Sequence, residues 1–88
     1  RIAQEVGMMA DRLYFHEECA RLAALLDQFR SLAEGPEQAG RKLNFLLQEM
    51  GREANTIGSK ANDVDIAHAV VVIKEELERL REQVQNVA

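Results

Sequence analysis

Two acidic side chains near the middle of the chain have the spacing of a metal-ligand pair. Glu49 and Glu53 are four residues apart, so on an α-helix their carboxylates lie on adjacent turns of one side. Two such hard oxygen ligands can hold Mg²⁺ or Mn²⁺, with water or phosphate oxygens completing the coordination. The alternative is a solvated glutamate pair that forms ion pairs with nearby basic residues. The spacing alone leaves both interpretations open.

Basic, amide and aromatic residues recur around the same two glutamates. Arginine can bind phosphate through two N–H groups, and an aromatic ring can stack on an unpaired base. Residues of these types, which indicate a nucleic-acid contact, are Arg41, Phe45, Gln48, Arg52, Asn55 and Lys60. In the alternative interpretation, the ring packs in a protein interface and the arginines pair with glutamates of neighbouring helices.

One helix must carry all of these side chains. Apolar residues recur at steps of three and four, which predicts a helix from Pro36 to about Ile57 with one buried stripe. The stripe consists of Leu43, Leu46, Leu47, Met50, Ala54 and Ile57. At about 100° per residue, the basic, amide and aromatic side chains fall on the opposite face. The pattern therefore presents them away from the core.

The remaining chain predicts two more helices. Residues 2–33 read as one long helix with apolar stripes on two nearly opposite faces, which needs either a partner chain or a kink near Gly7 or Asp11. The last helix is capped by Asn62 or Asp63 and carries a heptad-spaced apolar seam that ends at Val87. We therefore expect an all-α, three-helix bundle with long helices, a single domain over residues 1–88, that packs further into an oligomer.

Composition narrows the class of protein. The net charge is −4, and only residues 36–60 are positive in sum, so the predicted central helix is the least acidic part of the chain. No apolar run approaches the roughly 18 residues of a membrane span. The single cysteine, Cys19, excludes an internal disulfide and is typical of a protein of the reducing cytoplasm. Because the chain starts without methionine, we interpret it as part of a longer protein.

The central sequence resembles a known family. Residues 40–56, GRKLNFLLQEMGREANT, with GSK at 58–60 and REQVQN at 81–86, are similar to the bacterial YicC-like endoribonuclease family. The resemblance covers most of residues 28–88 and implies an oligomeric, metal-dependent, RNA-cleaving protein of the bacterial cytoplasm. This chain would be its C-terminal helical domain. It also implies RNA as the ligand of the basic and aromatic set, with Mn²⁺ or Mg²⁺ at the catalytic pair Glu49 and Glu53.

The chain departs from the family pattern in ways that support a second hypothesis. Asn44 stands where the family usually has Asp, Gly51 where Asn is common, and Ala24-Leu25 replaces a Ser-His pair. For the isolated 88 residues we therefore expect no cleavage. The second hypothesis is a non-enzymatic protein-binding or oligomerisation module, natural or engineered on this scaffold, with its rings on a helix exterior. Its contact patch would be Leu13, Tyr14, Phe15, His16 and Cys19.

Overall fold

The computed structural model of the chain describes residues 1–10, 15–36, 39–61 and 63–87. Over these residues the protein is entirely helical, as predicted, but it has four helices where the sequence predicted three. They are α1 (Ile2–Ala10), α2 (His16–Glu34), α3 (Gly40–Lys60) and α4 (Val64–Val87). None of the described helices is long and apolar enough to cross a membrane.

The difference in helix number comes from the N-terminal third, where the predicted helix of residues 2–33 is wrong. α1 ends at Ala10 and α2 begins at His16. A continuous straight helix would point its two apolar stripes in nearly opposite directions, and a bundle can cover only one of them. Splitting the segment lets both stripes enter one core. The buried residues are Ile2, Val6 and Met9 from α1, and Cys19, Leu22, Leu26 and Phe29 from α2. The two stripes therefore need no partner chain, and self-association stays a prediction.

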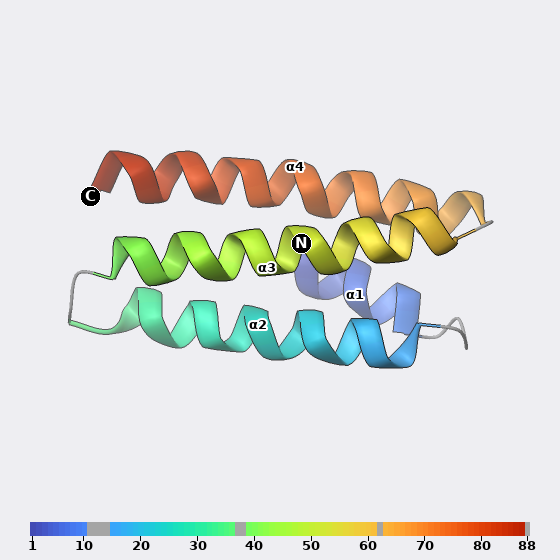
Figure 1. Cartoon of the computed structure of the whole chain (residues 1–88), viewed down its shortest axis with the longest axis horizontal. Helices are drawn as coiled ribbons and strands as arrows, with labels where there is room; N and C mark the ends of the chain where they lie inside the picture. The colour runs from blue at the N-terminus through green and yellow to red at the C-terminus, as the bar shows by residue number, and fades with distance from the viewer. Residues whose placement is uncertain (11–14, 37–38, 62, 88) are drawn as a thin grey trace.

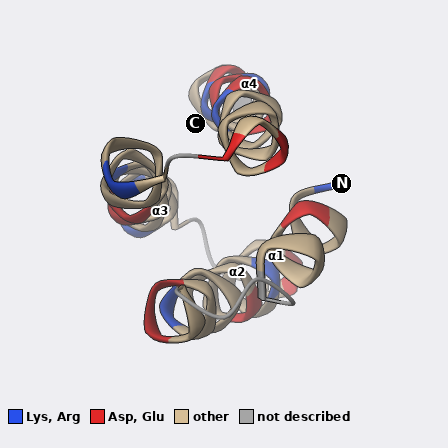
Figure 2. Cartoon of the chain, turned by 90° about the vertical axis from the view of Figure 1, so that its right-hand side faces the viewer, with Lys and Arg blue, Asp and Glu red and all other residues tan. Residues whose placement is uncertain are grey.

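The long helices α2, α3 and α4 run antiparallel in sequence order, and α3 packs against both of its neighbours (Figure 1). α1 lies on the opposite side of the bundle from α3 and contacts α2 and α4 (Figure 2). Within the described residues, α2 and α4 do not pack directly on each other. α3 and α1 thus close the bundle from two sides, but the short α1 extends over only part of its length.

The apolar stripe of α3 is confirmed as the centre of the core. Met50, Ala54 and Ile57 have no exposed surface, and Leu46 and Leu47 are buried. The helix begins at Gly40, four residues later than predicted, and continues to Lys60. Gly58 permits a close approach to α4, since a Cβ there would lie 3.3 Å from Val70 Cγ1. The packing against α2 and α4 fixes the rotation of α3 and so decides which side chains it exposes.

The start of α4 is set by a side-chain cap at one of the two predicted positions. Asp63 Oδ1 accepts hydrogen bonds from the backbone N–H groups of Asp65 (2.8 Å) and Ile66 (3.4 Å). Such a cap satisfies amide groups that have no partner within the helix. Asn62, the other candidate, lies outside the described residues. The cap helps to fix the position of α4 against α3.

Candidate functional site

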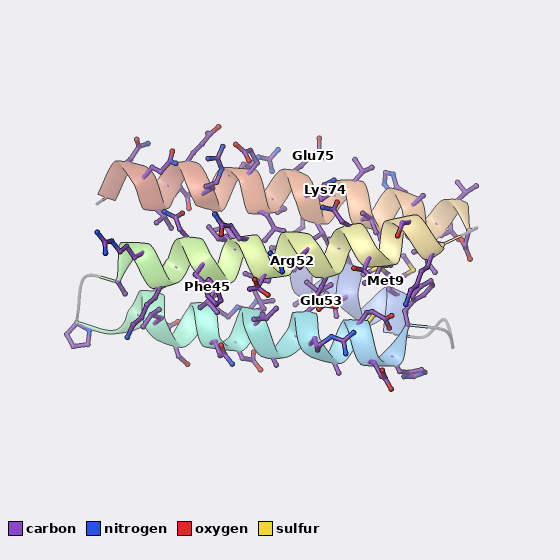
Figure 3. The ribbon with its side chains drawn as sticks, viewed as in Figure 1. Met9, Phe45, Arg52, Glu53, Lys74 and Glu75 are labelled. Atoms are coloured by element: carbon purple, nitrogen blue, oxygen red, sulfur yellow. The ribbon has the colours of Figure 1, made fainter. Side chains whose placement is uncertain are left out.

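The polar side of α3 forms a continuous exposed face. Its members recur at steps of four and three, and all are exposed; we call this set the outer face of α3: Arg41, Phe45, Gln48, Arg52, Asn55 and Ser59. Phe45 is 58% exposed, so an aromatic ring is accessible among the polar side chains of this face. Figure 3 shows Phe45 and Arg52 along the same helix. The structure thus brings together five of the six predicted contact residues on one face.

Arg52, one of the two cations of the outer face, remains accessible to a ligand although it has an ion-pair partner. Its side chain is 75% exposed, and its Nη2 lies 3.8 Å from Glu49 Oε1 on the preceding turn. An exposed ion pair of this kind contributes about 0–1 kcal/mol, so an anionic ligand can displace the glutamate at little cost. Asn55 is more constrained, because its Oδ1 accepts a hydrogen bond of 2.7 Å from Lys74 Nζ of α4.

The sixth predicted contact residue, Lys60, faces α2. Its Nζ donates a hydrogen bond of 3.2 Å to Glu18 Oε2. Glu18 is a buried carboxylate at the start of α2. A hydrogen bond from its own backbone N–H and one from Lys60 lower the pKa of Glu18 below its ordinary value. Lys60 therefore helps to join α3 to α2, although 60% of its side chain remains exposed.

Glu53 is also turned towards α2. Arg21 Nε donates a hydrogen bond of 3.1 Å to Glu53 Oε2, and the glutamate side chain is only 20% exposed. Its other oxygen, Oε1, is buried and has no hydrogen-bond partner among the described residues, and the same holds for Asn44 Oδ1. A buried acceptor without a partner costs about 1–3 kcal/mol. The free oxygen of Glu53 therefore favours an additional donor or cation at this point.

The donor set fits a metal only in part. Glu49 and Glu53 offer hard oxygen ligands, but each is already paired with an arginine, Arg52 and Arg21 respectively. Over the described ranges, no group of three or more His, Cys, Asp or Glu side chains could hold a metal ion. Any ion at these two glutamates would thus have two protein ligands from the described part of the domain and would complete its coordination with other oxygens.

Two residues of the alternative contact patch, Phe15 and Cys19, are buried in the core. Phe15 is 5% exposed and Cys19 is 2% exposed, so the prediction that a ring at Phe15 lies on the helix exterior is wrong. The break before His16 turns Phe15 into the core. Burial, with a smaller contribution from Glu18, raises the pKa of the Cys19 thiol, which makes it a poor nucleophile. His16 is exposed, whereas Leu13 and Tyr14 lie outside the described residues.

Arg21 and Glu18 are the site residues that the sequence did not indicate. Each pairs with a residue of α3 more than 30 positions away, Glu53 and Lys60 respectively. Glu18 and Arg21 are three residues apart, which places them on one side of α2. That spacing does not indicate which residues of another helix they pair with. The two pairs therefore depend on the packing of α2 against α3, which the sequence pattern does not give.

Comparison with known proteins identifies the family. The family description "Endoribonuclease YicC-like, C-terminal" matches residues 1–88. A protein of Clostridioides difficile named probable endoribonuclease YicC is 46% identical over 87 residues, which cover 99% of this chain and 30% of the relative. A protein of the same name from Haemophilus influenzae is 37% identical over 86 residues, which cover 98% of this chain and 30% of the relative. No solved structure matches the chain. The chain spans under a third of these relatives, and it belongs to the YicC-like endoribonuclease family, as the family's C-terminal domain.

Proposed function

We propose that the outer face of α3 contacts RNA, and that this domain thereby serves RNA cleavage by a longer protein in the bacterial cytoplasm. The observation that supports it is the exposure of Phe45, Arg41 and Arg52 on a single helix face, opposite the stripe that packs into the core. A phenyl ring among arginines on one exposed face can combine base stacking with phosphate contacts.

The chemistry of the face favours unpaired RNA. A ring with 58% of its surface exposed can stack on a base only if that base is not already stacked within a duplex. Arg41 and Arg52 on either side of it supply N–H donors for phosphate oxygens. The domain has a net charge of −4, so phosphate attraction alone would be weak. Stacking together with a few arginine contacts supplies the affinity that a generally basic surface would otherwise give.

We further propose Glu49 and Glu53 as two ligands of a Mn²⁺ or Mg²⁺ ion, with water and RNA phosphate oxygens completing the coordination. The donor chemistry and the partnerless Oε1 of Glu53 support this assignment. When bound, such an ion supplies positive charge that stabilises the phosphodiester as it breaks. Arg21 and Arg52 form ion pairs with the two carboxylates beside the RNA-contacting face.

Two exposed arginines give a matched test of RNA contact. Arg52 on α3 and Arg79 on α4 each pair with a glutamate three residues earlier, and their side chains are 75% and 67% exposed. Arg52→Gln should weaken binding of single-stranded RNA and reduce the salt dependence of binding by about one phosphate contact, whereas Arg79→Gln should change neither. Equal effects of the two substitutions would exclude a specific role for the outer face.

The metal assignment is tested by cleavage in the full-length protein. A Glu49→Gln, Glu53→Gln variant should bind RNA normally but cleave it at least about tenfold more slowly in Mn²⁺, which corresponds to about 1.4 kcal/mol of transition-state stabilisation. Glu78→Gln is the control, since Glu78 is a glutamate of α4 paired with Arg81 three residues later. Unchanged cleavage in the double variant would remove both glutamates from the site.

A further inference from the structure

One cation of α4 lies at the edge of the outer face of α3. Lys74 Nζ donates a hydrogen bond of 2.7 Å to Asn55 Oδ1, and both residues are exposed. In Figure 3, Phe45, Arg52 and Lys74 follow one another along the bundle, with Lys74 on the side of α4 that is turned towards α3. The exposed polar surface of α3 therefore continues across the α3–α4 contact onto α4.

Lys74 differs from the other two cations of α4 in the kind of partner it has. Arg79 and Arg81 each form an ion pair with a glutamate of their own helix, Glu76 and Glu78 respectively. The partner of Lys74 is instead a neutral amide, and over the described residues Lys74 forms no ion pair with a carboxylate. Its charge is therefore the least compensated of the three.

The hydrogen bond from Lys74 also fixes how the Asn55 amide is turned. An ammonium group carries only donors, so it faces the carbonyl oxygen of the amide, and the NH2 end of Asn55 points away from it. Arg52, three residues earlier on the outer face, likewise offers only N–H donors. Two helices thus contribute two cations and one amide NH2 group, all of them donors. Phosphate oxygens are acceptors, so a phosphate group fits this set.

We propose that Lys74 Nζ and the NH2 group of Asn55 bind one phosphate of the RNA, in addition to the phosphate contact of Arg52. The inference rests on the proposed RNA-binding role of the outer face, and it adds a residue from a second helix to that site. The ammonium keeps its hydrogen bond to Asn55 Oδ1, so two of its three N–H groups remain for the ligand. The bound strand therefore contacts α4 as well as α3.

Binding of a labelled single-stranded RNA over a range of salt concentrations tests this assignment. Lys74→Gln should raise Kd by about tenfold. It should also lower the slope of log Kd against log salt by about 0.7, the value for one phosphate contact on a single strand. Lys74→Arg keeps a cation and should retain the slope. Arg79→Gln is the matched control, because it removes one positive charge from the same helix at a residue already paired with a glutamate; it should change neither quantity.

Asn55→Asp separates RNA contact from a role of Lys74 in the fold alone. The substitution gives the Lys74 ammonium a carboxylate partner, so the link between α3 and α4 is kept while the NH2 donors are lost. Circular dichroism should show unchanged helix content, and the slope should fall as in Lys74→Gln. Gln83→Glu adds the same charge at an exposed position nine residues after Lys74, on the opposite side of α4, and should leave the slope unchanged.

Two outcomes would overturn the inference, and they differ in what they imply for the proposed function. If Arg52→Gln weakens RNA binding but Lys74→Gln has no more effect than Arg79→Gln, the outer face binds RNA without α4, and only this inference fails. If neither Arg52→Gln nor Lys74→Gln changes Kd or the slope, the RNA does not use the outer face, and the proposed function fails with it.

Discussion

Replacing Phe45 by alanine should separate RNA binding from folding. Phe45 is 58% exposed, so about two fifths of its surface is buried, and its removal should cost about 1 kcal/mol of folding free energy. Phe29, at 7% exposed, should cost about 3–5 kcal/mol when replaced by alanine. The α3 helix should therefore remain folded in Phe45→Ala.

The loss of RNA affinity should be the larger effect. Stacking of a base on an aromatic side chain is worth about 1–3 kcal/mol, which corresponds to a roughly 5- to 150-fold increase in Kd. This range assumes one unpaired base on the ring, which is the most that a single phenyl group on one helix face can hold against solvent.

Fluorescence titration of a labelled single-stranded RNA against the 88-residue chain measures this effect directly. Val71→Ala, which removes a similarly exposed apolar group from α4, is the control and should leave Kd unchanged. Circular dichroism on the same samples reports whether helix content is preserved. A Phe45→Ala protein that is folded and binds RNA as tightly as the parent would refute the stacking argument.

Two further predictions concern the fold. Met9→Ala should lower the free energy of unfolding by about 2–5 kcal/mol, because Met9 has no exposed surface and ties α1 to the core; a denaturant titration showing a loss under about 1 kcal/mol would contradict the four-helix packing. Glu18 stabilises the fold as a carboxylate, since its pKa is lowered by its backbone N–H and by Lys60. This contribution is complete above the ordinary glutamate pKa of about 4.3 and is lost as the pH falls through the lowered value. The difference in Tm between the parent and Glu18→Gln should therefore shrink as the pH falls from 6 to 2, and a constant difference would count against the Lys60–Glu18 pair.

The stripe of α3 and the composition of its outer face could be predicted because helical periodicity is a local property. Leu46, Met50 and Ile57 repeat at three and four residues, and that spacing alone places Arg41, Phe45 and Arg52 on the far side. The packing of α3 against α2 and α4 buries the same stripe that the spacing predicts.

The break between α1 and α2 was harder to predict, since the residues from Ile2 to Ala33 are acceptable in one helix. The signal was the change in direction of the apolar stripe between Met9 and Cys19. That change predicts either a break or a second partner, and choosing between them requires knowledge of how much surface α4 offers. The pairs Arg21–Glu53 and Glu18–Lys60 depend on tertiary contacts and had no local signal that could identify both partners.

The most direct test of the central claim is to map RNA contacts on the 88-residue chain by amide chemical-shift changes on titration with a short single-stranded RNA. The proposed function predicts that the largest changes lie on α3 between Arg41 and Asn55, with the outer side of α4 around Val71 unaffected. Changes centred on α4 or on the exposed side of α2, with α3 unperturbed, would contradict it.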